Sequence, residues 1–214
     1  MRYELYVITD RTVGRGRSHV NQAAAALEGG ADVIQLRDKV MGGRELLITA
    51  REICTLTEDT GALSIINDRL DIAIAAGASG VHLGQTDLPV GVAKALAPQG
   101  FITGVSVATL EEAQQAEKDG ADYVALSPVF DTQTKENAGP GHGLEILRTM
   151  RESLTIPVLA IGGIGLHNVR DVFNAGADGV AVVSAVVGKD DIAGAAAELK
   201  AHIKELRRNE NRTP

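Results

Sequence analysis

The stretch Gly30-Ala31-Asp32-Val33 decides the fold of this chain, because close variants of it return three more times. The further copies are Gly77-Ala78-Ser79-Gly80-Val81, Gly120-Ala121-Asp122-Tyr123-Val124 and Gly176-Ala177-Asp178-Gly179-Val180. Each copy follows a stretch of helical composition and opens a run of β-forming residues, so that glycine ends a helix and a strand begins at once. Each interval between copies has room for about two βα units, which favours a quasi-repeated barrel.

Outside these joints, apolar runs alternate with helix-period stretches, which is typical of parallel strands with crossover helices. Eight strands are predicted, at residues 5–9, 33–37, 63–67, 80–84, 102–106, 123–127, 158–162 and 179–184. Predicted helices include residues 19–28, 44–58, 110–119, 144–153, 169–175 and 191–208. The chain is therefore expected to be α/β, a single-domain TIM (β/α)₈ barrel over residues 1–206 with a polar tail at 207–214. A doubly wound open sheet is the competing architecture.

Composition narrows the classes of partner. The 214 residues carry a formal net charge of −7 and only 3% aromatic residues, which argues against nucleic-acid and anionic membrane surfaces. No apolar run approaches the roughly 20 residues that span a bilayer, and the first residues lack the pattern of a signal peptide. We expect a cytoplasmic protein with small-molecule ligands, and the sequence leaves a homo-oligomer open. The single cysteine, Cys54, is expected to be a small buried hydrophobe.

Cationic side chains follow the second predicted strand. Gln35, Arg37 and Lys39 alternate with Leu36, so they share one face, which points into the mouth of a barrel. A guanidinium fork and a lysine point charge at one strand end suit a phosphate or diphosphate. The alternatives are a solvated strand end or a pairing with Asp38.

Two carboxylates follow the next two strands. Asp68 comes after Asn67, and Asp87 comes shortly after the strand that contains His82. Mg²⁺ is commonly held by one or two carboxylates together with phosphate oxygens of a substrate, so Asp68 and Asp87 are predicted metal ligands. An ordinary Asn-Asp turn and a helix cap at Asp87 are the alternatives. His82 is expected to be a hydrogen-bonded core or rim residue and not a base.

Further polar positions follow the later strands. Ser106 ends the fifth strand, and the loop after the sixth offers Thr132-Gln133-Thr134-Lys135 to a phosphorylated ligand. Gly162-Gly163 and Val183-Ser184 end the seventh and eighth strands, where such barrels frequently bind phosphate. Loop polarity and a simple glycine turn remain as alternatives. Two phosphate pockets and a metal site imply two phosphorylated substrates, or one substrate phosphorylated at both ends.

Ordered motifs across residues 3–200 resemble the thiamine-phosphate synthase family. They are Leu5-Tyr6-Val7-Ile8-Thr9-Asp10, Gln35-Leu36-Arg37-Asp38-Lys39, Asn67-Asp68-Arg69, Gly80-Val81-His82-Leu83-Gly84-Gln85, Gly104-Val105-Ser106, Pro128-Val129-Phe130 with Thr134-Lys135, Ile161-Gly162-Gly163-Ile164 and Val183-Ser184-Ala185. The resemblance implies a Mg²⁺-dependent transferase that joins hydroxymethylpyrimidine diphosphate to hydroxyethylthiazole phosphate. It implies that diphosphate leaves first and that the thiazole nitrogen traps a pyrimidinylmethyl cation.

The resemblance also assigns residues. It places the pyrimidine diphosphate on Gln35, Leu36, Arg37, Asp38, Lys39, Asn67, Ser106 and Lys135, and the metal on Asp68 and Asp87. It places the thiazole phosphate on Thr132, Gln133, Thr134, Gly163, Val183 and Ser184, and makes Arg37, Lys39, Ser106 and Lys135 the catalytic set. Two positions depart from the family pattern: Ala108 stands where histidine is common, and Asp131 stands where proline is usual.

Two other functions remain open at this stage. A related thiazole tautomerase would bind a thiazole phosphate and carry out no diphosphate chemistry, so it would not need both carboxylates together with Arg37 and Lys39. A regulatory protein that binds thiazole or thiamine phosphate without turnover is the non-enzymatic alternative, and Ala108 is its one hint.

Overall fold

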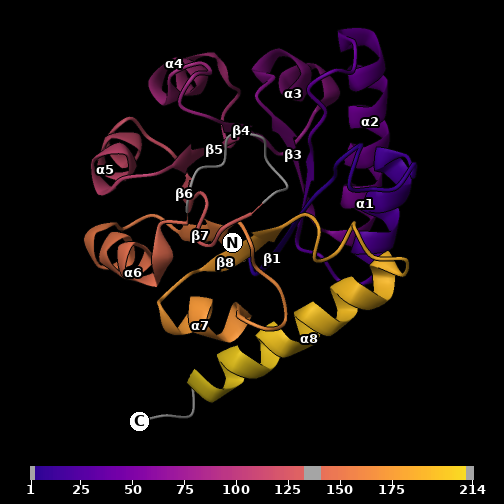
Figure 1. Cartoon of the computed structure of the whole chain (residues 1–214). Coiled ribbons are helices and arrows are strands. Elements are labelled where there is room, and N and C mark those ends of the chain that lie inside the picture. The colour runs from indigo at the N-terminus through magenta and orange to yellow at the C-terminus, as the bar shows by residue number, and fades with distance from the viewer. Residues whose placement is uncertain (1–2, 133–140, 211–214) are drawn as a thin grey trace.

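The computed structural model describes residues 3–132 and 141–210, and within them eight parallel strands close into a barrel (Figure 1). The strands are β1 (Leu5–Ile8), β2 (Val33–Leu36), β3 (Leu63–Asn67), β4 (Gly80–Leu83), β5 (Ile102–Val107), β6 (Tyr123–Leu126), β7 (Val158–Ile161) and β8 (Gly179–Val182). Each strand pairs with its sequence neighbours, and β1 also pairs with β8. This last pairing confirms the predicted (β/α)₈ barrel and rules out the open sheet.

Helices ring the barrel in chain order (Figure 1). They are α1 (His19–Glu28), α2 (Gly43–Thr60), α3 (Leu70–Ala76), α4 (Val90–Leu96), α5 (Leu110–Lys118), α6 (Gly143–Ser153), α7 (Val169–Asn174) and α8 (Ile192–Glu210). Several strands end one or two residues earlier than predicted, because residues such as Arg37 and Ser184 leave the ladder and begin the loops. Those loop-opening residues surround the mouth of the barrel.

The repeated Gly-Ala-Asp element has one structural role. Its aspartate precedes an even-numbered strand and accepts a hydrogen bond from an amide near the start of the odd-numbered strand before it. The bonds run from Leu5 N to Asp32 at 2.8 Å, from Thr103 N to Asp122 at 2.7 Å and from Val158 N to Asp178 at 2.8 Å. In the second copy Ser79 accepts from Ser64 N at 3.1 Å. The repeat therefore pins strands in pairs at the amino-terminal end of the barrel, which explains its fourfold return.

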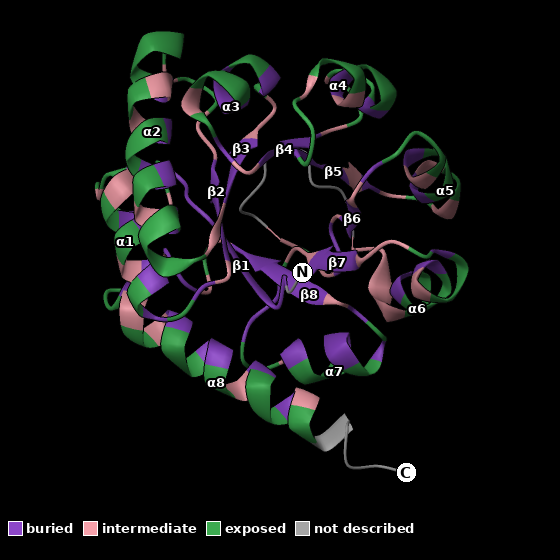
Figure 2. Cartoon of the chain, turned by 180° about the vertical axis from the view of Figure 1, so that it is seen from behind, coloured by how far each residue is buried: buried purple, intermediate pink, exposed green. Residues whose placement is uncertain are grey.

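Aromatic side chains fill the lower barrel interior. Tyr6 and Tyr123 are fully buried, and their ring centroids lie 6.2 Å apart in an edge-to-face arrangement. Gly104 on β5 makes room for them, because a Cβ there would overlap the Tyr123 ring. The alternate strand residues, such as Val7 and Leu36, point outward into the apolar layer beneath the helices. Figure 2 shows this layering, with buried strands inside and exposed outer helix faces.

The last helix, α8, completes the outer ring between α7 and α1 (Figure 1) and is tied to the amino-terminal end of the barrel by one lysine. Lys200 of α8 reaches Glu4 at 3.0 Å and Asp32 at 2.6 Å. Arg207, where the sequence predicts the polar tail to begin, lies inside α8, with its guanidinium 4.7 Å from the centroid of the Phe173 ring. Among the described helices, none is both long enough and apolar enough to cross a membrane.

Candidate active site

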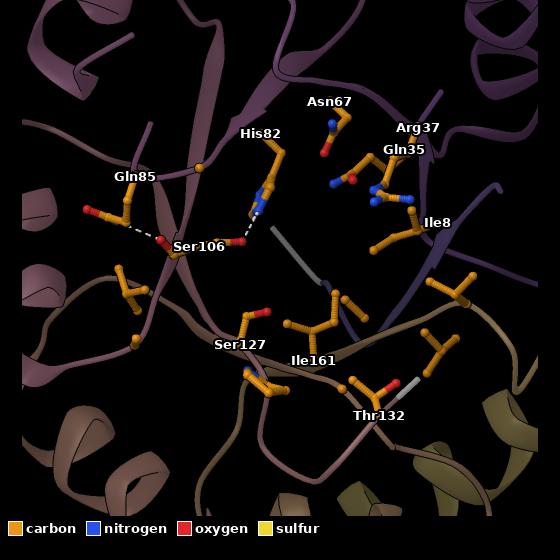
Figure 3. Close-up of a pocket in the computed structure, with 18 of the residues that line it drawn as sticks. Ile8, Gln35, Arg37, Asn67, His82, Gln85, Ser106, Ser127, Thr132 and Ile161 are labelled. Atoms are coloured by element: carbon orange, nitrogen blue, oxygen red, sulfur yellow. Dashed lines mark hydrogen bonds between the residues drawn. The ribbon is translucent and has the colours of Figure 1, made fainter. Parts of the chain in front are cut away.

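A cavity of about 660 Å³ opens at the carboxyl ends of the strands. Because side chains alternate along a strand, each strand points one side chain into the floor of this cavity, either from its own last residues or from the residue directly after it. A polar arc comes from β2 to β6, and an apolar arc comes from β7, β8 and β1. Figure 3 shows the polar arc, Gln35, Asn67, His82, Ser106 and Ser127, and two members of the apolar arc, Ile161 and Ile8. Ala181 of β8 also lines the apolar side. The cavity therefore offers two chemically different halves side by side.

Both predicted cations line the polar half. The Arg37 guanidinium lies 2.9 Å from the Asp10 carboxylate, and Lys39 Nζ lies 3.3 Å from Asp68 Oδ2. The alternative pairing of Arg37 with Asp38 is not what the structure shows. Because Asp10 holds Arg37 from one side, the guanidinium is oriented before an anion arrives.

The two predicted metal ligands both line the cavity. Asp68 adopts φ +61°, a left-handed conformation in which its amide donates to the His82 carbonyl at 2.8 Å. Asp87 Oδ2 accepts a hydrogen bond from the Gly84 amide at 2.6 Å. Pro89, not Asp87, is the N-cap residue of α4, so the alternative of a helix cap at Asp87 is wrong. Burial raises the pKa of the Asp68 carboxyl, and the adjacent Asp87 raises it further, against the lowering effect of Lys39.

This pair suits a hard cation. Within the described residues no group of three or more His, Cys, Asp or Glu side chains gathers as a metal site. Two mutually repelling carboxylates beside two cationic side chains match a site in which substrate oxygens complete the coordination of Mg²⁺. The donor set therefore fits the predicted metal, and Asp68 and Asp87 are the side chains that would hold it.

Two residues of the predicted diphosphate set do not line the cavity. The Leu36 side chain lies in the apolar layer beneath the helices, because alternation turns it away from the interior. The Asp38 carboxylate faces α1, where it accepts from Arg11 at 2.8 Å and lies 3.0 Å from His19 Nε2. As side chains, Leu36 and Asp38 thus support the β2 loop and do not face a ligand.

Asp38 is held in its charged form. Burial raises the pKa of its carboxyl, but hydrogen bonds from the Val40 amide, the Arg11 guanidinium and His19, with one from the Met41 amide, outweigh burial and hold that pKa well below its usual range. The loop that carries Lys39 is therefore anchored by a permanently charged group at neutral pH.

Ser106 lies opposite Arg37 in the polar half (Figure 3). His82 Nε2 lies 2.9 Å from its Oγ, and Gln85 Nε2 donates to its carbonyl at 2.7 Å. His82 is hydrogen-bonded through both ring nitrogens and buried, as the sequence predicts. Ala108, where the family commonly has histidine, also lines the cavity, and its amide donates to the Glu112 carboxylate at 2.7 Å.

Glycines shape the loop after β7. Gly162 and Gly163 have φ values of +102° and +65°, and a Cβ on either would meet the loop after β6. Asn168 fixes the loop by accepting from the Gly165 amide and donating to the Gly163 carbonyl, both at 2.9 Å. Gly163 lines the cavity together with Val183 and Ser184, as predicted, next to the apolar arc.

The loop after β6 is described only in part. Thr132 lines the cavity, whereas the predicted ligand contacts Gln133, Thr134 and Lys135 lie outside the described residues. The sequence interpretation missed several lining residues, among them Ile8, Thr86, Glu112, Ser127, His142 and Ile161. Period-two alternation would have found Ile8, Ser127 and Ile161, whereas Glu112 and His142 reach the cavity from α5 and the start of α6, for which the sequence held no signal.

Comparison with known proteins identifies the family. The model of the thiamine monophosphate synthase family matches residues 5–186. The chain belongs to this family. A thiamine-phosphate synthase from Methanoculleus marisnigri is 57% identical over 95% of this chain and 96% of its own, and one from Methanoregula boonei is 55% identical over 95% and 94%.

Solved structures agree with this assignment. Thiamine phosphate pyrophosphorylase from Pyrococcus furiosus superposes with a TM-score of 0.87 at 45% identity, covering 95% of this chain and 96% of that one. A 3-hexulose-6-phosphate synthase, at 21% identity and a TM-score of 0.71 over 92% and 99% of the two chains, shares the fold alone. The chain is thus an enzyme of the thiamine-phosphate synthase family, a transferase, and the non-enzymatic alternative loses its support.

Proposed function

We propose that the enzyme joins hydroxymethylpyrimidine diphosphate to hydroxyethylthiazole phosphate in a Mg²⁺-dependent, dissociative substitution. One observation carries the proposal: a single cavity combines a polar half, with two cations and a carboxylate pair, and an apolar half rimmed by the glycine loop. One half suits a diphosphate with its metal, and the other suits a flat sulfur heterocycle with a small phosphate.

The polar half takes the pyrimidine diphosphate. Arg37 and Lys39 bind diphosphate oxygens, and Gln35 and Asn67 on the floor present amides to the edge of the pyrimidine. Asp68 and Asp87 hold Mg²⁺, which when bound neutralises charge on the leaving diphosphate. Lys135 is proposed to add a cation, although it lies outside the described residues.

The apolar half takes the thiazole phosphate. Ile8, Ile161 and Ala181 give the ring a flat apolar floor, and Gly163, Val183 and Ser184 lie beside it at the rim. Backbone there can approach a phosphate closely because glycine carries no side chain. Thr132, with the predicted contacts Gln133 and Thr134, would cover the phosphate from the loop after β6.

The reaction needs alignment more than a base. The bond between the pyrimidinylmethyl carbon and the diphosphate oxygen breaks, and its electron pair leaves with diphosphate. The thiazole nitrogen then donates its lone pair to that carbon and forms the new C–N bond. The residues proposed here hold the leaving group, exclude water and fix the two rings, which are the contributions that such a step requires.

Diphosphate binding tests the metal site. In calorimetric titrations, inorganic diphosphate should bind the wild-type enzyme much more tightly with Mg²⁺ than with EDTA, and Asp68→Asn should lose that difference. Equal binding in both buffers would remove Asp68 and Asp87 from the proposal.

A substrate with an electron-withdrawing substituent on the pyrimidine should react far more slowly if a cation forms, whereas an unchanged rate would contradict the dissociative order.

Three expectations about cellular context stay predictions: a cytoplasmic location, no nucleic-acid or membrane partner, and a homo-oligomer left open. They do not bear on the chemistry of the cavity.

A further inference from the structure

A chain of hydrogen bonds runs through the barrel interior and joins two residues of the cavity floor. Gln35 Nε2 donates to Tyr6 Oη at 2.6 Å, and Tyr6 Oη lies 3.1 Å from Tyr123 Oη. Tyr123 Oη lies 2.9 Å from His82 Nδ1, and His82 Nε2 lies 2.9 Å from Ser106 Oγ. The chain therefore leaves the cavity at Gln35, passes through fully buried tyrosines and returns to it at Ser106.

The direction of these hydrogen bonds follows from the first donor. An amide nitrogen can only donate, so Tyr6 Oη accepts from Gln35 and its own proton is left for Tyr123. Tyr123 Oη then accepts from Tyr6 and has its proton left for His82 Nδ1. Each hydroxyl in turn accepts from one side and donates to the other.

The same logic fixes the tautomer of His82. A neutral imidazole that accepts at Nδ1 carries its proton on Nε2, so His82 donates to Ser106 Oγ. Ser106 Oγ is then an acceptor within the chain, and its own proton is free to turn toward the cavity that it lines. Figure 3 shows the His82–Ser106 bond at the edge of the open space.

We propose that Gln35, Tyr6, Tyr123 and His82 form a one-way hydrogen-bond chain that holds Ser106 as a hydrogen-bond donor to an anionic oxygen of the ligand. Tyr6, Tyr123 and His82 are positioning residues: they act on the ligand through Ser106. At its other end the chain uses the Gln35 amide nitrogen as donor, so the Gln35 carbonyl oxygen is left to accept from a ligand N–H.

Burial supports a fixed direction. Tyr6 and Tyr123 are 1% and 0% exposed, so water does not compete for their hydroxyls. Burial raises the pKa of the Tyr6 phenol well above its ordinary value, and burial likewise raises the pKa of Tyr123, so both remain neutral donors. Gly104 maintains the geometry, because any side chain there would displace the Tyr123 ring.

The inference rests on the proposed function, which places the pyrimidine diphosphate in the polar half of the cavity, where Ser106 is a lining residue. A hydrogen-bond donor that points at the leaving group binds it more strongly as negative charge develops there in the transition state. It therefore lowers the activation barrier of the reaction more than it increases the affinity for the substrate. A purely structural role for the tyrosines would not predict this split between kcat and KM.

Tyr123→Phe tests the chain, because it removes the one hydroxyl that links Tyr6 to His82. Tyr3→Phe is the matched control: it removes a tyrosine hydroxyl from the same aromatic cluster, with the two rings 5.2 Å apart, that takes no part in the five-residue chain. Imidazole ¹⁵N NMR of the wild type and both variants reports the His82 tautomer, with the signal assigned by its loss in His82→Gln.

The expected results separate this inference from the proposed function. Wild type and Tyr3→Phe should show His82 protonated at Nε2, whereas Tyr123→Phe should lose that preference. In the coupling assay, Tyr123→Phe should lower kcat about tenfold, less than the ~10²-fold cost of deleting an oxyanion donor, with KM for the pyrimidine diphosphate within about twofold.

A wild-type His82 protonated at Nδ1 would overturn the proposed hydrogen-bond chain, and this measurement needs no turnover and no folded Tyr123→Phe variant. Equal kcat values for Tyr123→Phe and Tyr3→Phe would also overturn it. A wild type without coupling activity would instead refute the proposed function, while the NMR result would still decide the direction of the hydrogen bonds.

Discussion

Replacing Lys200 with methionine should destabilise the barrel strongly and leave the cavity intact. The Lys200 side chain is 9% exposed, and its amine lies 2.6 Å from Asp32 and 3.0 Å from Glu4, whose side chain is 11% exposed. Methionine keeps most of the aliphatic stem but removes the charge. Two carboxylates at the amino-terminal end of the barrel would then face each other without their shared cation.

The expected magnitude follows from that burial. Removing one partner of a buried ion pair costs about 3–5 kcal/mol, because the remaining charge stays buried without compensation. Asp32 is 24% exposed and keeps its bond from the Leu5 amide, which favours the lower end, about 3 kcal/mol. For a domain of this size each kcal/mol lowers Tm by roughly 2–4 °C, so a fall of roughly 6–12 °C is expected.

Urea unfolding followed by circular dichroism, together with calorimetry, measures the loss. Lys94→Met is the matched control, because its pair with Asp122 is more exposed, at 32% and 38%, and should contribute at most about 1 kcal/mol. Lys200→Met combined with Glu4→Gln should recover part of the loss, and coupling activity at 25 °C should persist in both. A Lys200→Met variant no less stable than Lys94→Met would show that the buried cation does not hold this end of the barrel together.

Three further predictions concern single residues. Gly104→Ala should lower the free energy of unfolding in urea by about 1–3 kcal/mol, because the new Cβ would overlap the Tyr123 ring. Gly91→Ala, in an open helical position, is the control and should raise the free energy of unfolding by about 0.5–1 kcal/mol. Equal effects of the two substitutions would contradict the packing of Gly104 against Tyr123. Asp68→Asn should lower Mg²⁺-dependent turnover by about 10²-fold or more, yet the metal-free Tm should not fall, because a repelled charge is removed and asparagine tolerates φ +61°. The pKa of Asp38 is lowered in the folded state, so its carboxylate stabilises the folded protein fully above about pH 4, and this contribution is lost as the pH falls further. The urea midpoint should therefore fall more between pH 6 and pH 3 in the wild type than in Asp38→Asn.

The sequence predicted the barrel because its signals are local. A glycine that ends a helix beside a run of β-formers is legible within a few residues, and Gly30, Gly120 and Gly176 all adopt positive φ. The role of the aspartates in the repeat became visible only in the structure. Each accepts a hydrogen bond from an amide about 20 residues or more away in the sequence, and no local pattern identifies that amide.

The candidate site divides in the same way. Alternation along β2 brought Gln35, Arg37 and Lys39 into one cavity as predicted. The role of Asp38 was not predictable from the sequence, because its partners Arg11 and His19 come from another segment of the chain. Their contacts hold the Asp38 carboxylate away from the cavity. The Tyr6–Tyr123 contact joins residues 117 positions apart, which pairing along one strand cannot reveal.

The coupling reaction itself decides whether this cavity is a Mg²⁺-dependent synthase. Purified enzyme is given hydroxymethylpyrimidine diphosphate and hydroxyethylthiazole phosphate, in Mg²⁺ or in EDTA. Thiamine phosphate is detected by its fluorescent oxidation product. We expect product with Mg²⁺, no product with EDTA, and a loss of product in Asp87→Ala, a variant that should retain the wild-type circular dichroism spectrum. Product of equal yield in EDTA, or full activity in that variant, would contradict this expectation.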